Sequence, residues 1–114
     1  LADALPRYRR SLLDLCGRIF DLHKVLNAHY YHPEFHGSWS IKSVLPALVP
    51  NLSYADLDIK DGTLASLSFG QMIFHETSRE EKAKIRQSLL AYCKRDTEAM
   101  VEIYGMLVAR NEVI

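Results

Sequence analysis

The stretch that decides the fold runs from Ser78 to Ala109 and reads SREEKAKIRQSLLAYCKRDTEAMVEIYGMLVA. It opens with Ser78-x-x-Glu81, a capping box in which the serine oxygen and the glutamate each accept a hydrogen bond from a backbone N–H at the start of a helix. Apolar residues then recur at helical spacing as far as Ala109. The pattern predicts a single helix of about thirty residues.

One acid interrupts the apolar side of this helix. At about 100° per residue, with Leu89 set at zero, five apolar side chains fall within about 40° of Leu89. These are Ile85, Cys93, Met100, Ile103 and Leu107. Asp96 falls at about −20°, inside the stripe, and Tyr92 lies at its edge one turn earlier.

A carboxylate held among apolar side chains needs a partner, because burying an isolated charge is costly. Three partners are open for Asp96. It can pair with an Arg or Lys from another helix, it can cap a neighbouring helix, or it can bind a cation while the Tyr92 hydroxyl steers a water molecule. The geometry of one helix does not choose between them.

The first third of the chain predicts two short helices. Pro6 is suited to open the first of them and Gly17 to end it. Residues 23–31 show helical spacing, but residues 18–22 fit either a buried strand or the start of that second helix. Little of the chain predicts strand.

Two more helices are expected in the middle of the chain. Ser40 is suited to cap a helix over residues 41–48, which Pro46 should kink or loosen. Asp61 and Gly62 begin a helix that runs to about Phe74. Its expected inner side consists of Ala65, Phe69, Met72 and Ile73.

The composition is that of a soluble domain with an ordinary core. The chain has 114 residues, 48% of them hydrophobic and 25% charged. Lys plus Arg and Asp plus Glu number 14 each, so the formal net charge is zero. A long-range field that attracts nucleic acid or an anionic membrane is therefore absent, although a local basic patch is not excluded.

The sequence contains no sign of export or membrane insertion. No apolar run approaches the roughly 18 residues that span a bilayer. The first five residues contain an acid where a signal peptide has basic residues, and they lack an initiator Met. We therefore expect a cytoplasmic piece of a longer protein. Cys16 and Cys93 are expected to be buried free thiols.

A histidine-rich loop offers a rival site. Its members are His29, His32 and His36, with His23 or Cys16 as a further ligand. Neutral imidazoles at this spacing can hold Zn²⁺, but Pro33 breaks the helix that would align them. Whether this loop binds metal is left open by the sequence.

The same loop carries aromatic residues beside a lysine. Tyr30, Tyr31, Phe35 and Trp39 precede Lys42. Such side chains can stack on the bases of a single strand, or they can anchor the loop to the core. If they bind nucleic acid, Trp39 and Lys42 are the candidate contacts.

The segment Leu89–Thr97 resembles the last motif of DnaQ-like exonucleases of the DEDDy type, in which an Asp follows a Tyr by four residues on a helix. Tyr92 and Asp96 match that pair. Upstream, Arg18–Leu22 resembles the strand that precedes the substrate-side helices of this family. Residues 38–45 resemble its Ser-x-Ser-Leu helix start, with an isoleucine in the place of the leucine.

The run from Tyr31 through Asp61, taken with the Tyr-Cys-x-x-Asp-Thr ending, resembles more closely an uncharacterised bacterial family, domain of unknown function 2779, which is assigned to the same superfamily. The resemblance implies an RNase H-like α/β fold. Residues 1–114 would be one partial domain, the mainly α C-terminal half of that fold, with at most one or two short strands.

The resemblance also implies a chemistry. In this superfamily four acids hold two divalent cations, Mg²⁺ or Mn²⁺, that clamp the scissile phosphate, while the tyrosine orients the attacking water. Asp96 matches the last metal ligand and Tyr92 the tyrosine, so both are the expected catalytic residues. The first motif, Asp-x-Glu, has no counterpart, and the second should lie before Leu1. We therefore expect nucleic-acid phosphodiester cleavage by the complete domain, and neither activity nor a bound metal for this piece.

The partners follow from the same reasoning. The missing N-terminal half of the domain would cover the sheet-facing sides of these helices, and without it an exposed apolar surface favours a homodimer or larger oligomer. The alternative function is a helical protein-interaction or scaffold module with vestigial nuclease ancestry. In that case Asp96 is a structural acid.

Overall fold

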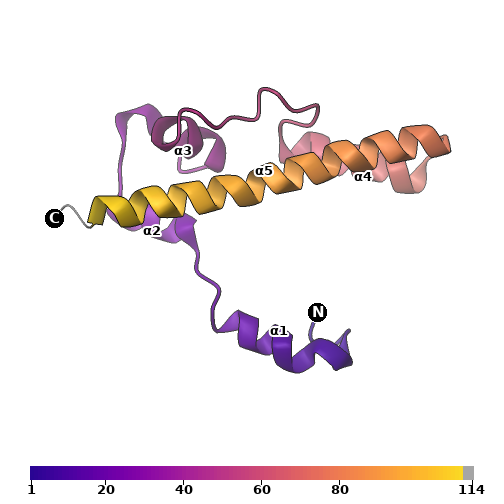
Figure 1. Ribbon diagram of the computed structural model, residues 1–114, viewed down its shortest axis with the longest axis horizontal. Helices are drawn as coiled ribbons and strands as arrows, with labels where there is room; N and C mark the ends of the chain where they lie inside the picture. Colours follow the sequence, from indigo (N-terminus) through magenta and orange to yellow (C-terminus); the bar gives the residue numbers. More distant parts are fainter. Residues whose placement is uncertain (112–114) are drawn as a thin grey trace. The chain divides into compact units, whose positions relative to one another are not determined.

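The computed structural model describes residues 1–111 and is mainly helical, as predicted (Figure 1). Within these residues there is no β-strand. The chain divides into two compact units, Leu1–Tyr30 and the part from Tyr31 onward. Each unit is described by itself, and the assignment of all 114 residues to one partial domain stays a prediction.

The N-terminal unit consists of a 3-10 turn, η1 (Pro6–Tyr8), and the helices α1 (Arg9–Cys16) and α2 (Leu22–His29). Asp21 caps α2, because its carboxylate accepts hydrogen bonds from the backbone N–H groups of His23 and Lys24 at 3.0 and 3.4 Å. Of the two structures that residues 18–22 fit, the strand, which the family resemblance also implies, is therefore not formed, and the run ends at the start of α2. Asp21 is the N-cap of α2. Ile19 and Phe20, which precede it, are exposed and do not form a buried strand.

The second unit has its core around α3 (Ile41–Leu48), which lies against the 3-10 turn η2 (Pro33–Phe35) and against α5 (Arg79–Asn111). Ser40 precedes α3 in an extended conformation, and its carbonyl accepts the first helical hydrogen bond. The helix continues through Pro46 to Leu48. The buried side chains of this core are Phe35, Val44, Leu45, Leu48, Ile59, Ala99 and Ile103.

Helix α4 (Gly62–Phe74) begins where predicted and packs against α5. Asp61 caps it by accepting a hydrogen bond from the Leu64 N–H at 2.8 Å. The predicted inner side is only partly correct, because Phe69 and Ile73 are each about half exposed. Apolar residues occur on every side of α4, so helical spacing alone cannot identify the side that is buried.

Helix α5 begins with the predicted capping box: the Glu81 N–H donates to the Ser78 hydroxyl at 3.2 Å, and the Ser78 N–H donates to Glu81 at 3.1 Å. Its most buried residues are Ala99 and Ile103. They define a face rotated by about 60° from the predicted stripe centre at Leu89, since each residue advances by about 100°.

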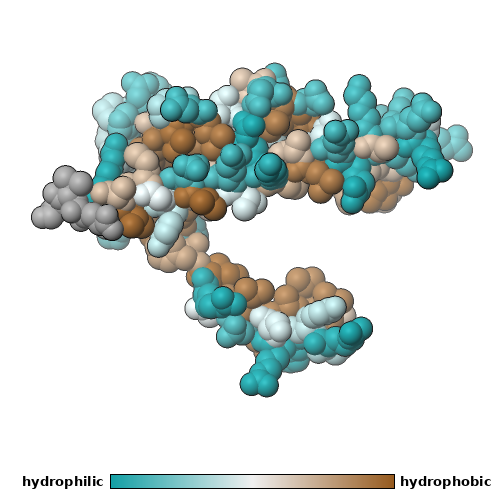
Figure 2. All heavy atoms as spheres, in the orientation of Figure 1, coloured by the Kyte–Doolittle hydropathy of each residue, from teal (hydrophilic) through white to brown (hydrophobic). Residues whose placement is uncertain are grey.

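This rotation also explains why a cysteine of α5 is exposed. Cys93, expected to be buried, is exposed, because it lies on the side of α5 that turns away from Ala99. Cys16 is also exposed, at the end of a helix whose apolar side chains are largely uncovered. Apolar side chains accordingly lie at the surface of both units (Figure 2).

Two adjacent helices of the second unit carry much of that surface. The groove between α4 and α5 is lined mainly by the apolar residues Ala65, Phe69, Met72, Leu89, Leu90 and Cys93. Among the helices of residues 1–111, none combines the length and the apolar character needed to cross a bilayer.

Candidate functional site

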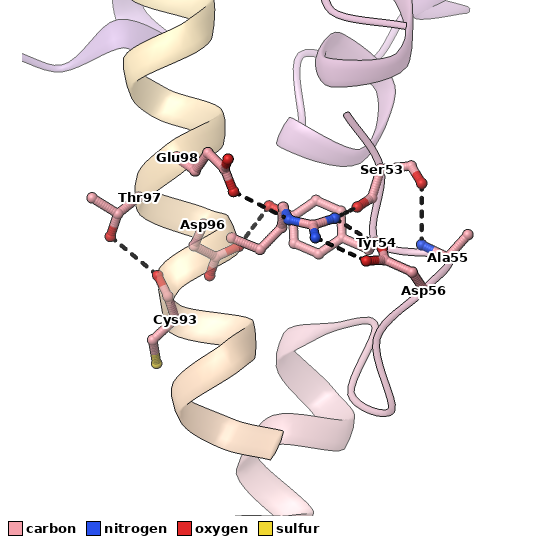
Figure 3. A network of polar contacts seen from close by, with 9 residues as sticks. Ser53, Tyr54, Ala55, Asp56, Cys93, Asp96, Thr97 and Glu98 are labelled. Carbon is pink, nitrogen blue, oxygen red and sulfur yellow. Dashed lines mark hydrogen bonds and ion pairs between the residues drawn. The ribbon is translucent and has the colours of Figure 1, made fainter. Parts of the chain in front are cut away.

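The inward carboxylate of α5 has a tyrosine as its partner. The Tyr54 hydroxyl donates a hydrogen bond to Asp96 Oδ1 at 2.6 Å (Figure 3). This distance is typical of a hydroxyl bound to an ionised carboxylate. Tyr54 lies in the loop between α3 and α4, and both side chains are half-buried. The sequence predicts an arginine or lysine, a helix end or a cation as the partner of Asp96, and the tyrosine is none of these.

The neighbouring residue, Arg95, fastens the same loop to α5. Its guanidinium forms two hydrogen bonds of 2.9 Å to the carboxylate of Asp56, and a further one to the Ser53 carbonyl (Figure 3). Glu98, one turn along α5, lies 3.4 Å from Arg95 Nε. Only 17% of the Arg95 side chain is exposed. The two anchors, Ser53 and Asp56, flank Tyr54 in the sequence.

This arrangement separates the two acids of the network. The guanidinium is taken by Asp56, and within residues 1–111 Asp96 forms no ion pair. Among the described residues of the second unit, Asp96 also caps no helix, since Asp61 caps α4 and no side chain caps α3. Asp96 is therefore held by a neutral donor on one oxygen.

Tyr92 lies beside this pair. Its ring centroid is 5.9 Å from that of Tyr54. Its hydroxyl points to the start of α4, 3.9 Å from the position that a Cβ on Gly62 would occupy. The Tyr92 hydroxyl thus lies near the start of α4, and the side chain as a whole is half-buried. The structure brings together Tyr92 and Asp96, as the helical spacing requires.

The electrostatics keep both phenols protonated. Burial raises the pKa of Tyr54 above its ordinary value, and the hydrogen bond and negative charge of Asp96 raise it further. Burial and then the charge of Asp96 also raise the pKa of Tyr92. The hydrogen bond from Arg95 lowers the pKa of Asp56. At neutral pH the cluster therefore presents two hydroxyl donors around one carboxylate.

Lys42 lies near the same cluster. Its ammonium is 3.8 Å from the carboxylate of Asp61, the residue that caps α4. The backbone N–H of Leu64 and the charge of Lys42 lower the pKa of Asp61, and the charge of Asp61 in turn contributes to the raised pKa of Tyr92. One of the two candidate nucleic-acid contacts is thus paired with an acid whose charge acts on Tyr92. Its side chain is 57% exposed.

The other candidate, Trp39, lies in an aromatic cluster. Its ring centroid is 6.3 Å from Tyr31, which in turn is 6.5 Å from Phe35. Phe35 is fully buried, Trp39 is half-buried and Tyr31 is exposed. Phe35 is therefore a core anchor, and Tyr31 is the cluster's most accessible ring.

The histidines of the rival site have local roles. His32 Nδ1 accepts a hydrogen bond from the Glu34 N–H at 3.2 Å, and His36 Nε2 lies 3.8 Å from the Glu34 carboxylate. His36 adopts a left-handed conformation that ends η2. Across residues 1–111, no three side chains among His, Cys, Asp and Glu form a group able to hold a metal ion.

This last finding also defines what Asp96 can offer to a cation. A half-buried carboxylate with one oxygen held by a hydroxyl suits a single position in a metal site. Mg²⁺ usually takes one or two carboxylates together with waters and substrate phosphates. In the described part of the chain, Asp96 offers a single carboxylate of this kind, and a metal site would need further carboxylates from elsewhere.

The comparison with known families gives one match. Residues 1–40 match the family described as "Domain of unknown function (DUF2779)". The matched part covers the N-terminal unit and η2, and it ends before α3. No curated protein and no solved structure matches the chain.

Proposed function

We propose that Asp96 and Tyr92 are the last carboxylate and the tyrosine of a metal-dependent, DEDDy-type exonuclease domain that cleaves nucleic-acid phosphodiesters. The other three acids come from another part of the protein, so residues 1–114 alone are inactive. One observation carries the proposal: Asp96 lies on the inward side of α5, and within residues 1–111 it has hydroxyl neighbours but forms no ion pair with an arginine or lysine.

The chain's own residues have distinct tasks in this proposal. Asp96 presents an oxygen to a divalent cation, and Tyr92, which stays protonated, donates its hydroxyl hydrogen to orient a water molecule. When bound, Mg²⁺ or Mn²⁺ neutralises charge on the scissile phosphate. In this proposal Lys42 contacts the phosphate backbone of a strand at the start of α4, and its exposed ammonium, 3.8 Å from the Asp61 carboxylate, supports that task.

A cleavage assay on the intact protein that contains residues 1–114 tests the proposal. The substrates are end-labelled single-stranded DNA and RNA, with Mg²⁺ or Mn²⁺ supplied separately. We expect Asp96→Asn to abolish cleavage. The matched control is Glu102→Gln, which alters an exposed acid of the same helix outside this network and should retain cleavage. Full activity of Asp96→Asn would rule the proposal out.

The second candidate function is a helical protein-interaction module. The exposed apolar groove between α4 and α5 favours it, because a surface of this kind is suited to another helix or chain. The intact sequence discriminates between the two candidates. A nuclease requires an Asp-x-Glu strand and a following Asn-x-x-x-Asp or Asn-x-x-x-Glu helix upstream, whereas an interaction module requires neither.

A further inference from the structure

Tyr54 is the residue of this cluster that no sequence motif indicates. It belongs to the loop between α3 and α4, 42 positions before Asp96, yet its hydroxyl makes the shortest contact to that carboxylate, 2.6 Å to Oδ1. Hydrogen bonds from Arg95 fix the position of this loop. Arg95 holds the residue before Tyr54 through the Ser53 carbonyl and the second residue after it through Asp56.

The clamp and the contact occupy adjacent positions of one helix. Arg95 binds the loop and Asp96 receives its tyrosine, so a shift of the loop would break both sets of hydrogen bonds together. Bidentate guanidinium–carboxylate pairs fix orientation as well as distance. The Tyr54 hydroxyl is therefore pre-positioned by a contact that does not itself involve Asp96.

A donor on one carboxylate oxygen has a geometric effect. The terminal torsion of an aspartate is broad and roughly two-fold, so an unbound carboxylate samples many orientations. The hydrogen bond at Oδ1 restricts that rotation and leaves Oδ2 in a defined direction. Groups that hold a metal-binding carboxylate in this way typically affect metal affinity or activity by about 10–100-fold when they are removed.

We propose that Tyr54 is a positioning residue for Asp96: its hydroxyl, secured by the Arg95–Asp56 clamp, orients the carboxylate for a divalent cation. This inference rests on the proposed function, because it assigns a role toward the cation that Asp96 would bind. It adds a residue from outside the helix that carries Tyr92 and Asp96.

The test measures Mn²⁺ binding by titration calorimetry in the intact protein, alongside cleavage as a function of Mn²⁺ concentration. Tyr54→Phe removes only the hydroxyl and should weaken Mn²⁺ binding by about 10–100-fold, with the cleavage curve displaced to higher Mn²⁺ by the same factor. The matched control is Tyr104→Phe at an exposed tyrosine of α5, the helix that carries Asp96, and it should leave both readouts unchanged.

A second variant tests the same role without changing Tyr54, in case Tyr54→Phe does not fold. Arg95→Met keeps the Tyr54 hydroxyl but loosens its loop, so it should also weaken Mn²⁺ binding, by a smaller factor. Unaltered Mn²⁺ binding in a folded Tyr54→Phe protein, with Asp96→Asn unable to bind, would overturn the positioning role and leave the proposed function intact. Wild-type protein that neither binds Mn²⁺ nor cleaves would overturn both.

Discussion

Asp56 and Asp96 lie within one network but have partners of different kinds, a guanidinium and a phenol hydroxyl. The difference gives a stability prediction for the 114-residue chain. Asp96→Asn keeps an oxygen that accepts from Tyr54, so its unfolding free energy should stay close to that of the wild type. Asp96→Leu leaves the Tyr54 hydroxyl without an acceptor and should cost about 1–3 kcal/mol.

Urea unfolding of the two variants, followed by circular dichroism, measures this difference. The comparison is informative because both substitutions remove the same charge, and only one removes the acceptor. Equal losses in the two variants would mean that the charge of Asp96, and not its hydrogen bond, contributes to stability.

The raised pKa of Tyr54 predicts a late phase in an alkaline titration. Tyrosines in water titrate near pH 10, roughly the ordinary value. Tyr54 should ionise at higher pH, because burial and its bond to Asp96 favour the neutral phenol, and Asp96→Asn should move this phase down. The ultraviolet absorbance of tyrosinate measures this phase.

The sign of the linked stability change follows from the same shift. Because the pKa of Tyr54 is higher in the folded than in the unfolded chain, its contribution to stability is fully present below about pH 10 and is lost as the pH rises above that value. A late phase that persists unchanged in Asp96→Asn would show that Asp96 does not contribute to the raised pKa of Tyr54.

At the scale of elements, the clamp between α5 and the preceding loop gives a third prediction. Arg95→Met removes three hydrogen bonds to that loop. It should lower the melting temperature by a few degrees, because the clamp ties the loop to α5. The shift should be small, since the partner Asp56 is 62% exposed and exposed ion pairs contribute little to stability.

Hydrogen exchange locates the effect. In Arg95→Met the amides of residues 53–58 should exchange faster, while those of α4 keep their wild-type rates. Arg86→Met, which removes an exposed arginine from the same helix, should change neither readout. Uniformly faster exchange throughout the second unit would show that Arg95 supports the whole fold and not the loop alone.

Helix ends were predictable from the sequence because their signals are local. The capping box at Ser78 and the cap at Asp61 both lie where expected, and each depends only on residues within one turn. The buried side of α5 was predicted with an error of about 60°, since apolar residues cover too wide an arc for spacing to fix its centre. Which part is buried depends on neighbours distant in the sequence.

The site shows the same division. The proximity of Tyr92 and Asp96 follows from helical geometry, so the sequence sufficed to pair them. Tyr54 could not be found in this way, because its contact to Asp96 depends on how the loop after α3 is fastened to α5. A charged neighbour was the one available hint: Arg95 lies next to Asp96, but helical spacing places it on a different side.

At the scale of the molecule, the exposed apolar groove between α4 and α5 leads to a prediction of self-association. The 114-residue chain should form dimers or larger species, because the groove offers a continuous apolar surface. Phe69→Glu places a charge inside it and should shift the chain toward monomer. Lys94→Glu, on the exposed polar side of α5, should not.

Light scattering coupled to size-exclusion chromatography, over a range of concentrations, measures this association. A wild-type chain that remains monomeric at the highest concentration would contradict the prediction. An oligomer that persists in Phe69→Glu would instead place the contact on another surface.

Anomalous diffraction from Mn²⁺-soaked crystals of the intact protein tests whether a divalent cation binds Asp96 on the inward side of α5. We predict a manganese peak within coordination distance of the Asp96 carboxylate, with the Tyr54 hydroxyl still bound to Oδ1. If no peak appears and Asp96 is paired instead with an arginine or lysine from another part of the protein, Asp96 is not a ligand of a divalent cation.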